Sequence, residues 1–311
     1  MQQTLRKLDR AFNDMKSKGM GFPRYKKKIK SFNILGKISV EGKYIKMPLL
    51  KNIKFRKSRD IPKGFKIKQI QIIKKASGYY ANLMIDGDVD VVKPIPHGHA
   101  IGIDAGISSM IATSDGLILT RPSFLDKALR KIKLLQRKLR NKKKGSNKSN
   151  QLSSRIALLH ETVANKRKEY HFNLAHQLCD GVGMIFVEEI NFVSWSKGLF
   201  AKQSNDMGLG QFFNILEYVC FKTDTYFAKV DKNYTSQICP NCGTHTGKKD
   251  LSVRLHSCLE CGYIQNRDVA ASEIVRNRGL ESIAVGAPVI KRTSAVLGVS
   301  LNERLVQETA Q

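Results

Sequence analysis

The sequence predicts a mixed α/β protein in which a β-rich module comes first and a small metal-binding module interrupts the domain that follows. Three observations support this prediction. Short runs rich in Ile, Val and aromatic residues fill residues 23–95, separated by Gly, Asn, Asp and Pro. After residue 97, strand and helix patterns alternate. Two Cys-x-x-Cys pairs then precede a final helical pattern.

The net charge indicates the kind of partner. The 311 residues include 54 Lys and Arg against 26 Asp and Glu, which gives a formal charge of +28. Such a surplus favours a polyanion, and nucleic acid is the first choice. No apolar run approaches the roughly 20 residues that cross a bilayer, and no signal-peptide pattern follows Met1. We therefore expect a cytoplasmic protein with no membrane partner, of undetermined oligomeric state.

The N-terminal part is predicted to contain one amphipathic helix, in "LRKLDRAFNDM", and then the antiparallel β-rich module. The blocks 24–30 and 51–59 alternate cations with apolar residues, as one solvated cationic face of a sheet would. Such a face is either ordinary solvated surface or a phosphate-binding surface, and the total charge leaves both open.

Two later strands are predicted to end in carboxylates. The first runs through Ile103 to Asp104 and is followed by a hairpin at Asp115 and Gly116. The second, "MIFV", runs directly into Glu188 and Glu189, of which at most one can point where Asp104 points. A strand-end acid is often only a turn or solvated residue, so neither carboxylate is assigned from its strand alone.

The rest of the second domain is predicted to be mainly helical. Two helices span residues 122–179, joined by an exposed lysine-rich link, and their histidines are interpreted as surface or packing residues. A loop is predicted over 196–210, then an amphipathic helix and a strand near "YFAKVD". Cys179 and Cys220 are interpreted as small buried hydrophobes.

Four of the six cysteines form two pairs with the spacing of a zinc ribbon. The pairs are Cys239 with Cys242 and Cys258 with Cys261, each followed by a glycine that permits a tight turn. A redox dithiol needs only one pair, and a disulfide quartet needs an oxidising compartment. Four thiolates fill a tetrahedral shell, so we expect a structural Zn²⁺ that folds this insert.

Asp268 follows the second pair and begins the helical pattern "VAASEIV". Taken alone, an aspartate at a helix start is usually an N-cap. Taken with Asp104 and Glu188, it completes a set of three hard carboxylates of the kind that holds two Mg²⁺ ions roughly 4 Å apart in nucleases.

The motifs "GIDAG", "FVEEIN" and "CPNC…CLECGYIQNRDVAAS", in this order, resemble the TnpB (OrfB) proteins of insertion-sequence transposons, relatives of the type V CRISPR effector nucleases. The resemblance covers residues 1–279. It implies an RNase H-like RuvC nuclease domain with an inserted zinc ribbon, preceded by a β-rich wedge module that is similar to an oligonucleotide-binding barrel and grips guide RNA.

The resemblance also implies the roles of the site residues. Asp104, Glu188 and Asp268 match the catalytic carboxylates that bind Mg²⁺, and Glu188 matches rather than Glu189 because it directly follows the strand. The four zinc ligands match Cys239, Cys242, Cys258 and Cys261.

Domain boundaries follow from the same resemblance. Family members begin with a wedge strand and a helical recognition region, of which "MQQTLRKLDRAF" resembles only the last helix, so we expect an N-terminally short copy. The expected domains are a residual recognition helix (1–22), the wedge (23–96), the first part of the nuclease domain (97–237), the ribbon (238–265), the last part of the nuclease domain (266–280) and a flexible tail (281–311).

The function implied by the resemblance is that of a transposon-encoded, RNA-guided, Mg²⁺-dependent DNA endonuclease, with guide RNA and target DNA as partners. One alternative is a catalytically inactive guide-RNA and DNA binder that acts as a repressor. Another is a transposase that transfers DNA strands itself, against which the resemblance argues, because in this family the recombination chemistry resides in a partner protein.

Overall fold

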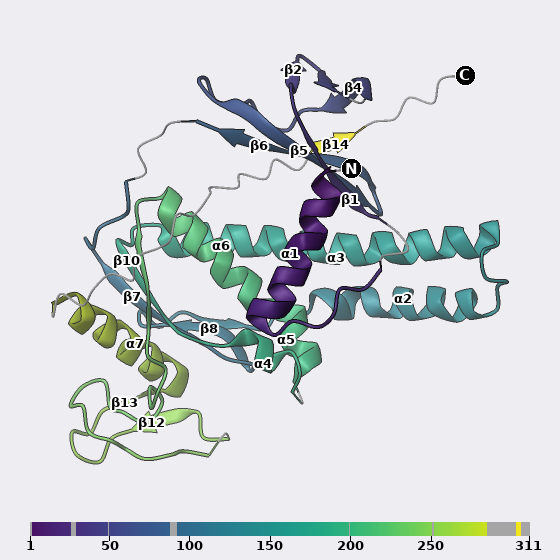
Figure 1. The fold of residues 1–311 in the computed structure, drawn as a ribbon. Helices are drawn as coiled ribbons and strands as arrows, with labels where there is room; N and C mark the ends of the chain where they lie inside the picture. Colours follow the sequence, from purple (N-terminus) through teal and green to yellow (C-terminus); the bar gives the residue numbers. More distant parts are fainter. Residues whose placement is uncertain are drawn as a thin grey trace. The chain divides into compact units, whose positions relative to one another are not determined.

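The computed structural model describes residues 2–25, 29–48, 50–87, 92–198, 200–250, 252–284 and 303–305. The chain divides into two compact units, one formed by residues 1–90 with 292–311 and the other by residues 91–291. Figure 1 traces the helices and strands of both units along the sequence. None of the described helices combines the length and the apolar character that a bilayer crossing requires.

The first unit contains one helix and an antiparallel sheet with strand order β1-β5-β6-β14-β4-β3-β2. Its elements are α1 (Gln2–Lys18), β1 (Ser31–Leu35), β2 (Ser39–Glu41), β3 (Tyr44–Met47), β4 (Leu50–Arg56), β5 (Lys66–Lys75), β6 (Gly78–Asp86) and β14 (Glu303–Leu305). The antiparallel strands predicted within residues 23–95 are therefore present. Strands β1 and β2 are separated by a break that contains Gly36, whose φ of 122° suits a glycine.

Strands β3 and β4 of this sheet alternate between apolar and cationic residues. Ile45, Met47 and Phe55 are buried in the core of the first unit. Lys46, Lys54 and Arg56, which alternate with them, are exposed. This alternation is the one expected for block 51–59, and it gives the sheet one cationic face. Block 24–30 lies partly outside the described residues.

The second unit is a mixed α/β fold around a sheet of order β11-β10-β7-β8-β9. Its elements are β7 (Ala100–Ala105), β8 (Ser109–Thr113), β9 (Ile118–Thr120), α2 (Phe124–Arg140), α3 (Asn147–Cys179), β10 (Met184–Glu188), α4 (Phe192–Trp195), α5 (Ala201–Met207), α6 (Leu209–Lys222), β11 (Tyr226–Val230), β12 (Leu255–Ser257), β13 (Ile264–Asn266) and α7 (Arg267–Ala284). Strands β7, β10 and β11 are parallel, whereas β8 and β9 add antiparallel to the edge.

The two faces of the central strands are buried against different helices. On one face, Ile103 and Val187 join the large core that includes residues of α3 and α6. On the other face, Phe186 packs with Val275 of α7. Because strand residues alternate, the residues of β7 and β10 on the α7 side have even numbers.

Helix α7 lies so close to the sheet that two glycines leave no room for a side chain. A Cβ on Gly102 of β7 would lie 2.0 Å from the carbonyl oxygen of Ser272, and a Cβ on Gly279 of α7 would lie 2.1 Å from Cγ of Phe186. This close packing fixes where the first turn of α7 lies relative to β7.

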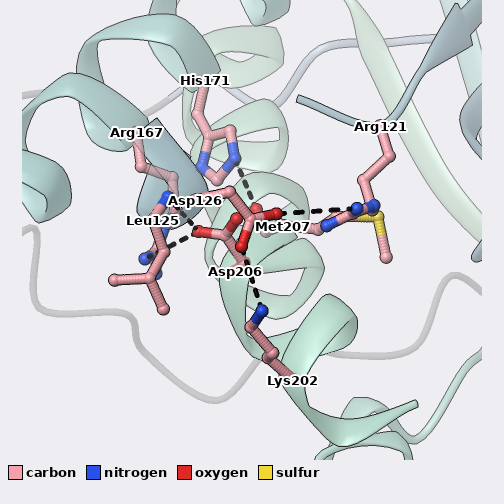
Figure 2. Close-up of polar contacts among 8 residues, drawn as sticks. All are labelled: Arg121, Leu125, Asp126, Arg167, His171, Lys202, Asp206 and Met207. Atoms are coloured by element: carbon pink, nitrogen blue, oxygen red, sulfur yellow. Dashed lines mark hydrogen bonds and ion pairs between the residues drawn. The ribbon is translucent and has the colours of Figure 1, made fainter. Parts of the chain in front are cut away.

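The prediction of a loop over residues 196–210 is wrong in part, because Ala201–Met207 forms helix α5. A tertiary contact joins this helix to the start of α2. Asp206 is 3% exposed, and its Oδ1 accepts a hydrogen bond from the backbone N–H of Leu125 at 3.0 Å (Figure 2). Ser123, at the N-cap position of α2, makes no side-chain capping bond, so Asp206 supplies the missing acceptor at that helix start.

A histidine and an arginine of α3 also contact the last residues of α5 (Figure 2). Arg167 Nη2 lies 3.8 Å from Asp206 Oδ1, and His171 Nε2 lies 3.0 Å from the carbonyl oxygen of Met207. Because a carbonyl only accepts, the proton of the neutral imidazole is on Nε2. Burial lowers the pKa of His171 to about 4, so this side chain is a neutral packing residue, as the sequence predicts.

The C-terminal boundary also differs from the prediction. Helix α7 continues to Ala284, beyond the predicted end of the nuclease domain at residue 280, and residues 303–305 form β14. The rest of the segment predicted to be a flexible tail lies outside the described residues.

Candidate functional site

Two of the three predicted carboxylates meet through parallel strand pairing. Val187 of β10 is in register with Ile103 of β7, so the next residues, Glu188 and Asp104, are neighbours across the two strands. Both carboxylates lie on the face covered by α7, at the carboxyl ends of their strands. Glu189 is exposed, whereas Glu188 is partly buried.

The third carboxylate reaches the same edge on the first turn of α7. Asp268 is the second residue of this helix, and its Oδ2 accepts a hydrogen bond from Oγ of Ser109, the first residue of β8. Its own backbone N–H donates to Oδ1 of Asn266 at 2.9 Å. Asn266 therefore caps the helix start, and the side chain of Asp268 is left for other contacts.

The electrostatics of Asp104 show that the three acids are close. Burial raises the pKa of Asp104 well above its usual value of 3.8, and the negative charges of Glu188 and then Asp268 raise it further. The backbone N–H of Ala105 and the charge of Arg267 act in the opposite direction. Asp104 is thus the central member of a cluster of mutually repelling carboxylates.

Glu188 is held by a hydroxyl and flanked by charged residues. Burial raises the pKa of its carboxyl group above the usual 4.5. The hydroxyl of Thr235 opposes this rise by donating to Glu188 Oε1 at 2.6 Å, as do the positive charges of Arg278 and Lys232. The carboxylate is therefore fixed on one side by a buried donor.

The three carboxylates are spaced more widely than the ligands of one small ion. Within the described parts of the chain, the four ribbon cysteines are the only group of three or more His, Cys, Asp or Glu ligand atoms that all lie within 4.8 Å of one another. The carboxylates share an edge of the sheet instead of one tight shell.

The four predicted ribbon cysteines come together as expected and could bind a metal ion such as zinc. The Sγ atoms of Cys239 and Cys261 are 3.7 Å apart, and those of Cys242 and Cys258 are 3.6 Å apart. A tetrahedral site with zinc to sulfur distances of about 2.3 Å has sulfurs roughly 3.8 Å apart. The observed separations match that geometry and are far longer than a disulfide bond of about 2 Å.

The ribbon backbone has the turns that two knuckles require. Gly243 and Gly262 have φ values of 75° and 72°, and the N–H of each bonds back to the carbonyl of the first cysteine of its pair. Strands β12 and β13 form an antiparallel hairpin with the second cysteine pair between them, and β13 leads into α7. His256 is buried and contacts Nζ of Lys249 at 2.7 Å, outside the thiol cluster.

Sequence reasoning missed three residues that contact the carboxylate cluster or its helix: Ser109, Thr235 and Asn266. Ser109 and Thr235 meet their carboxylates across 159 and 47 residues, so no local pattern could have indicated them. The capping role of Asn266 could have been predicted, because an asparagine just before a helix commonly accepts a hydrogen bond from the second N–H of that helix.

Two family models match the chain over the segments that build these sites. A model described as "Probable transposase" (OrfB, IS605) matches residues 86–196, which include Asp104 and Glu188. A model described as "Cas12f1-like, TNB domain" matches residues 210–275, which include the four cysteines and Asp268.

Similar proteins cover most of the chain. A Streptomyces pristinaespiralis protein named "Putative RNA-guided DNA endonuclease" is 27% identical over 92% of this chain and 72% of its own length. Escherichia coli K12 has "Putative RNA-guided DNA endonuclease InsQ", which is 27% identical over 93% of this chain and 76% of its own length. Among solved structures, a CRISPR-Cas12f ternary complex matches with a TM-score of 0.48 and 17% identity, over 85% of this chain and 67% of that one. The order of the motifs, both family models and the names of these two bacterial relatives together support the TnpB (OrfB) family of insertion-sequence transposons as the family of this chain.

Proposed function

We propose that this chain is a transposon-encoded, RNA-guided endonuclease that cuts DNA at the cluster of Asp104, Glu188 and Asp268. One observation carries the proposal: two parallel strands and a helix start, far apart in sequence, bring three acids to one edge of a sheet. Grouping acids in this way raises the pKa of Asp104 and opposes folding. Such unfavourable arrangements are typical of functional sites.

The residues fit Mg²⁺. The donors are carboxylate oxygens, which Mg²⁺ prefers, and a cation would offset the repulsion that raises the pKa of Asp104. Asp104, Glu188 and Asp268 would hold the ions, in our proposal two of them. When bound, Mg²⁺ supplies activation of a water molecule and stabilisation of the leaving oxygen of a phosphodiester.

Three positively charged side chains of this chain lie near the carboxylates. Arg267 lowers the pKa of Asp104, and Arg278 and Lys232 lower that of Glu188, so all three lie within electrostatic reach of the cluster. Positive groups here would attract the phosphates of a nucleic-acid strand and hold its backbone beside the carboxylates.

The fold and the relatives support the remaining parts of the proposal. We propose that the second unit is an RNase H-like RuvC nuclease domain and that the first unit is a wedge that grips guide RNA with its cationic sheet face. The relatives' names support guide RNA and target DNA as partners. In such a protein the RNA reads sequence by base pairing, and the protein contacts shape and backbone.

The thiol cluster has a different proposed role. Four thiolates around Zn²⁺ leave no open position for water, so the ion would fold the ribbon and take no part in hydrolysis. The ribbon would then fix the path of the chain from Cys261 to Asp268.

Purification of the chain with RNA expressed from its own locus allows a direct test. The complex is expected to cut a plasmid library only when Mg²⁺ is present, and Asp104→Ala is expected to reduce cutting by about 10³-fold or more, because the carboxylates act as a unit. Glu189→Ala is the matched control, since it removes an exposed acid one residue beyond Glu188.

Cleavage that survives Asp104→Ala would overturn the assignment of the site. RNA binding without cleavage by the unaltered protein would favour the alternative of a guide-bound repressor.

A further inference from the structure

Two of the three carboxylates are each held by a hydroxyl from another element. Thr235 Oγ1 donates to Glu188 Oε1 at 2.6 Å, and Ser109 Oγ donates to Asp268 Oδ2. Both hydroxyl residues are buried, at 7% exposed for Thr235 and 9% for Ser109. A buried, charge-assisted hydrogen bond of this kind fixes the orientation of a carboxylate.

The hydroxyls occupy one oxygen of each carboxylate and leave the other. Among the residues that the structure describes, no protein group donates a hydrogen bond to Glu188 Oε2 or to Asp268 Oδ1. An ionised carboxylate only accepts, so the hydroxyls must be the donors. The unbound oxygens are the ones left for a cation.

Thr235 belongs to a turn that precedes the first cysteine pair, and this turn is bound to the ribbon by hydrogen bonds and a ring contact. The N–H of Thr246, near the first knuckle, donates to the carbonyl of Gln237 at 2.7 Å, and Ile238 pairs with His245. Tyr234 adopts a left-handed φ of 60°, and its ring packs edge-on against His245 with centroids 5.5 Å apart. A non-glycine residue with positive φ persists only where its surroundings determine it.

The ribbon therefore reaches the carboxylate cluster at both of its ends. Before Cys239 the chain presents Thr235 to Glu188, and after Cys261 strand β13 leads directly into the turn of α7 that carries Asp268. One folded insert thus sets two of the three carboxylates.

We propose that Thr235 and Ser109 are positioning residues that orient Glu188 and Asp268 so that one oxygen of each is available to a divalent cation. Through Thr235, the folding of the four-cysteine ribbon is coupled to the geometry of Glu188. This inference rests on the proposed nuclease site and adds to it two residues that hold the ligands and do not touch the substrate.

The test compares two substitutions of Thr235. Thr235→Val keeps the shape of the side chain and removes the hydroxyl, whereas Thr235→Ser keeps the hydroxyl. Mn²⁺ binding to the purified, zinc-loaded chain is measured by electron paramagnetic resonance, with Asp104→Ala to identify the signal of this site. Removing a group that orients a metal ligand costs about 10–100-fold in metal affinity, so Thr235→Val should weaken Mn²⁺ binding by that factor and raise the Mg²⁺ concentration for half-maximal cleavage similarly.

Rescue by the conservative variant separates positioning from general stability. Thr235→Ser should bind Mn²⁺ within about threefold of the unaltered chain, and both variants should keep their zinc in native mass spectrometry. If Thr235→Val loses zinc or unfolds, Ser109→Ala with Ser109→Thr repeats the comparison at Asp268, away from the ribbon.

The failure of this inference can be told apart from that of the proposed function. Equal Mn²⁺ affinity in the Val, Ser and unaltered proteins overturns the positioning role even if all three cut DNA. Hydroxyl-dependent Mn²⁺ binding in a protein that cuts nothing supports the positioning role and overturns the nuclease.

Discussion

The four thiols and the three carboxylates differ in how far apart their residues lie in the sequence. The thiols come from two knuckles between Cys239 and Cys261, and each knuckle is closed by its own glycine turn. The carboxylates come from β7, β10 and α7, and they meet only once the second unit has folded. With a metal ion bound, the first site would be a closed shell that stabilises its own segment, whereas the second is an open cluster whose repulsion the rest of the fold must offset.

The comparison gives the reason why we propose a structural role for one cluster and a chemical role for the other. A tetrahedral thiolate shell has no free position, so its ion can only hold the chain. The carboxylates keep unbound oxygens, and the negative charges of Glu188 and Asp268 that raise the pKa of Asp104 would also attract a cation from solution.

The largest expected effect is the loss of the ribbon on removal of its metal. Folding of small zinc modules depends on metal binding worth on the order of 10 kcal/mol. Cys242→Ser should remove the single zinc from the native mass spectrum and make residues 239–266 sensitive to protease, while the sheet of the second unit remains resistant. Cys242→His, which keeps a zinc ligand, is the control. Stoichiometric zinc in Cys242→Ser would show that the shell is not a four-thiolate site.

A smaller effect is expected from Gly102→Ala, which disturbs the open cluster through packing. The added Cβ would lie 2.0 Å from the Ser272 carbonyl oxygen, so α7 and Asp268 must shift. Overpacking of this kind costs about 1–3 kcal/mol, to be measured by urea unfolding, and cleavage should fall with it.

Gly262→Ala in the ribbon is the matched control for that change. Nothing lies within 4 Å of its added Cβ, and only the positive φ of 72° opposes the substitution, at a cost of about 1–2 kcal/mol. Cleavage should be retained in Gly262→Ala. A Gly102→Ala protein with full activity would show that the position of α7 is less critical than its packing indicates.

The smallest expected effect is a gain in stability. The pKa of Asp104 is raised on folding, so the folded state binds this proton more tightly than the unfolded state does. Its ionisation therefore lowers stability as pH rises from the unfolded value of 3.8, and the cost is complete above the raised folded pKa.

Asp104→Asn removes that cost, so in the absence of divalent cations at neutral pH it should raise the melting temperature, by about 2–4 °C for each kcal/mol regained. Mg²⁺ should stabilise the unaltered chain more than Asp104→Asn. A variant that melts earlier than the unaltered chain without Mg²⁺ would contradict the repulsion within the cluster. Calorimetry with and without Mg²⁺ distinguishes these outcomes.

Several elements could be predicted from local pattern because local forces determine them. The strand containing Asp104, the strand ending at Glu188, the two long helices and the thiol cluster all follow from periodicity, turn residues and ligand spacing. Helix α5 was not predicted, and its contact with the start of α2, through Asp206, joins residues that are 81 positions apart. Thr235 and Ser109 were missed for a similar reason, since they contact their carboxylates across 47 and 159 residues.

By itself, the sequence determined which residues could form a metal ribbon and which strand ends carry acids, because Cys-x-x-Cys knuckles and strand periods are encoded within a few residues. Only the tertiary structure decided that Glu188 pairs beside Asp104, that Asn266 caps the helix of Asp268, and that hydroxyls from Thr235 and Ser109 each occupy one carboxylate oxygen. The physical reason is that strand register, helix packing without a Cβ at Gly102, and hydrogen bonds between distant segments are set by the whole fold.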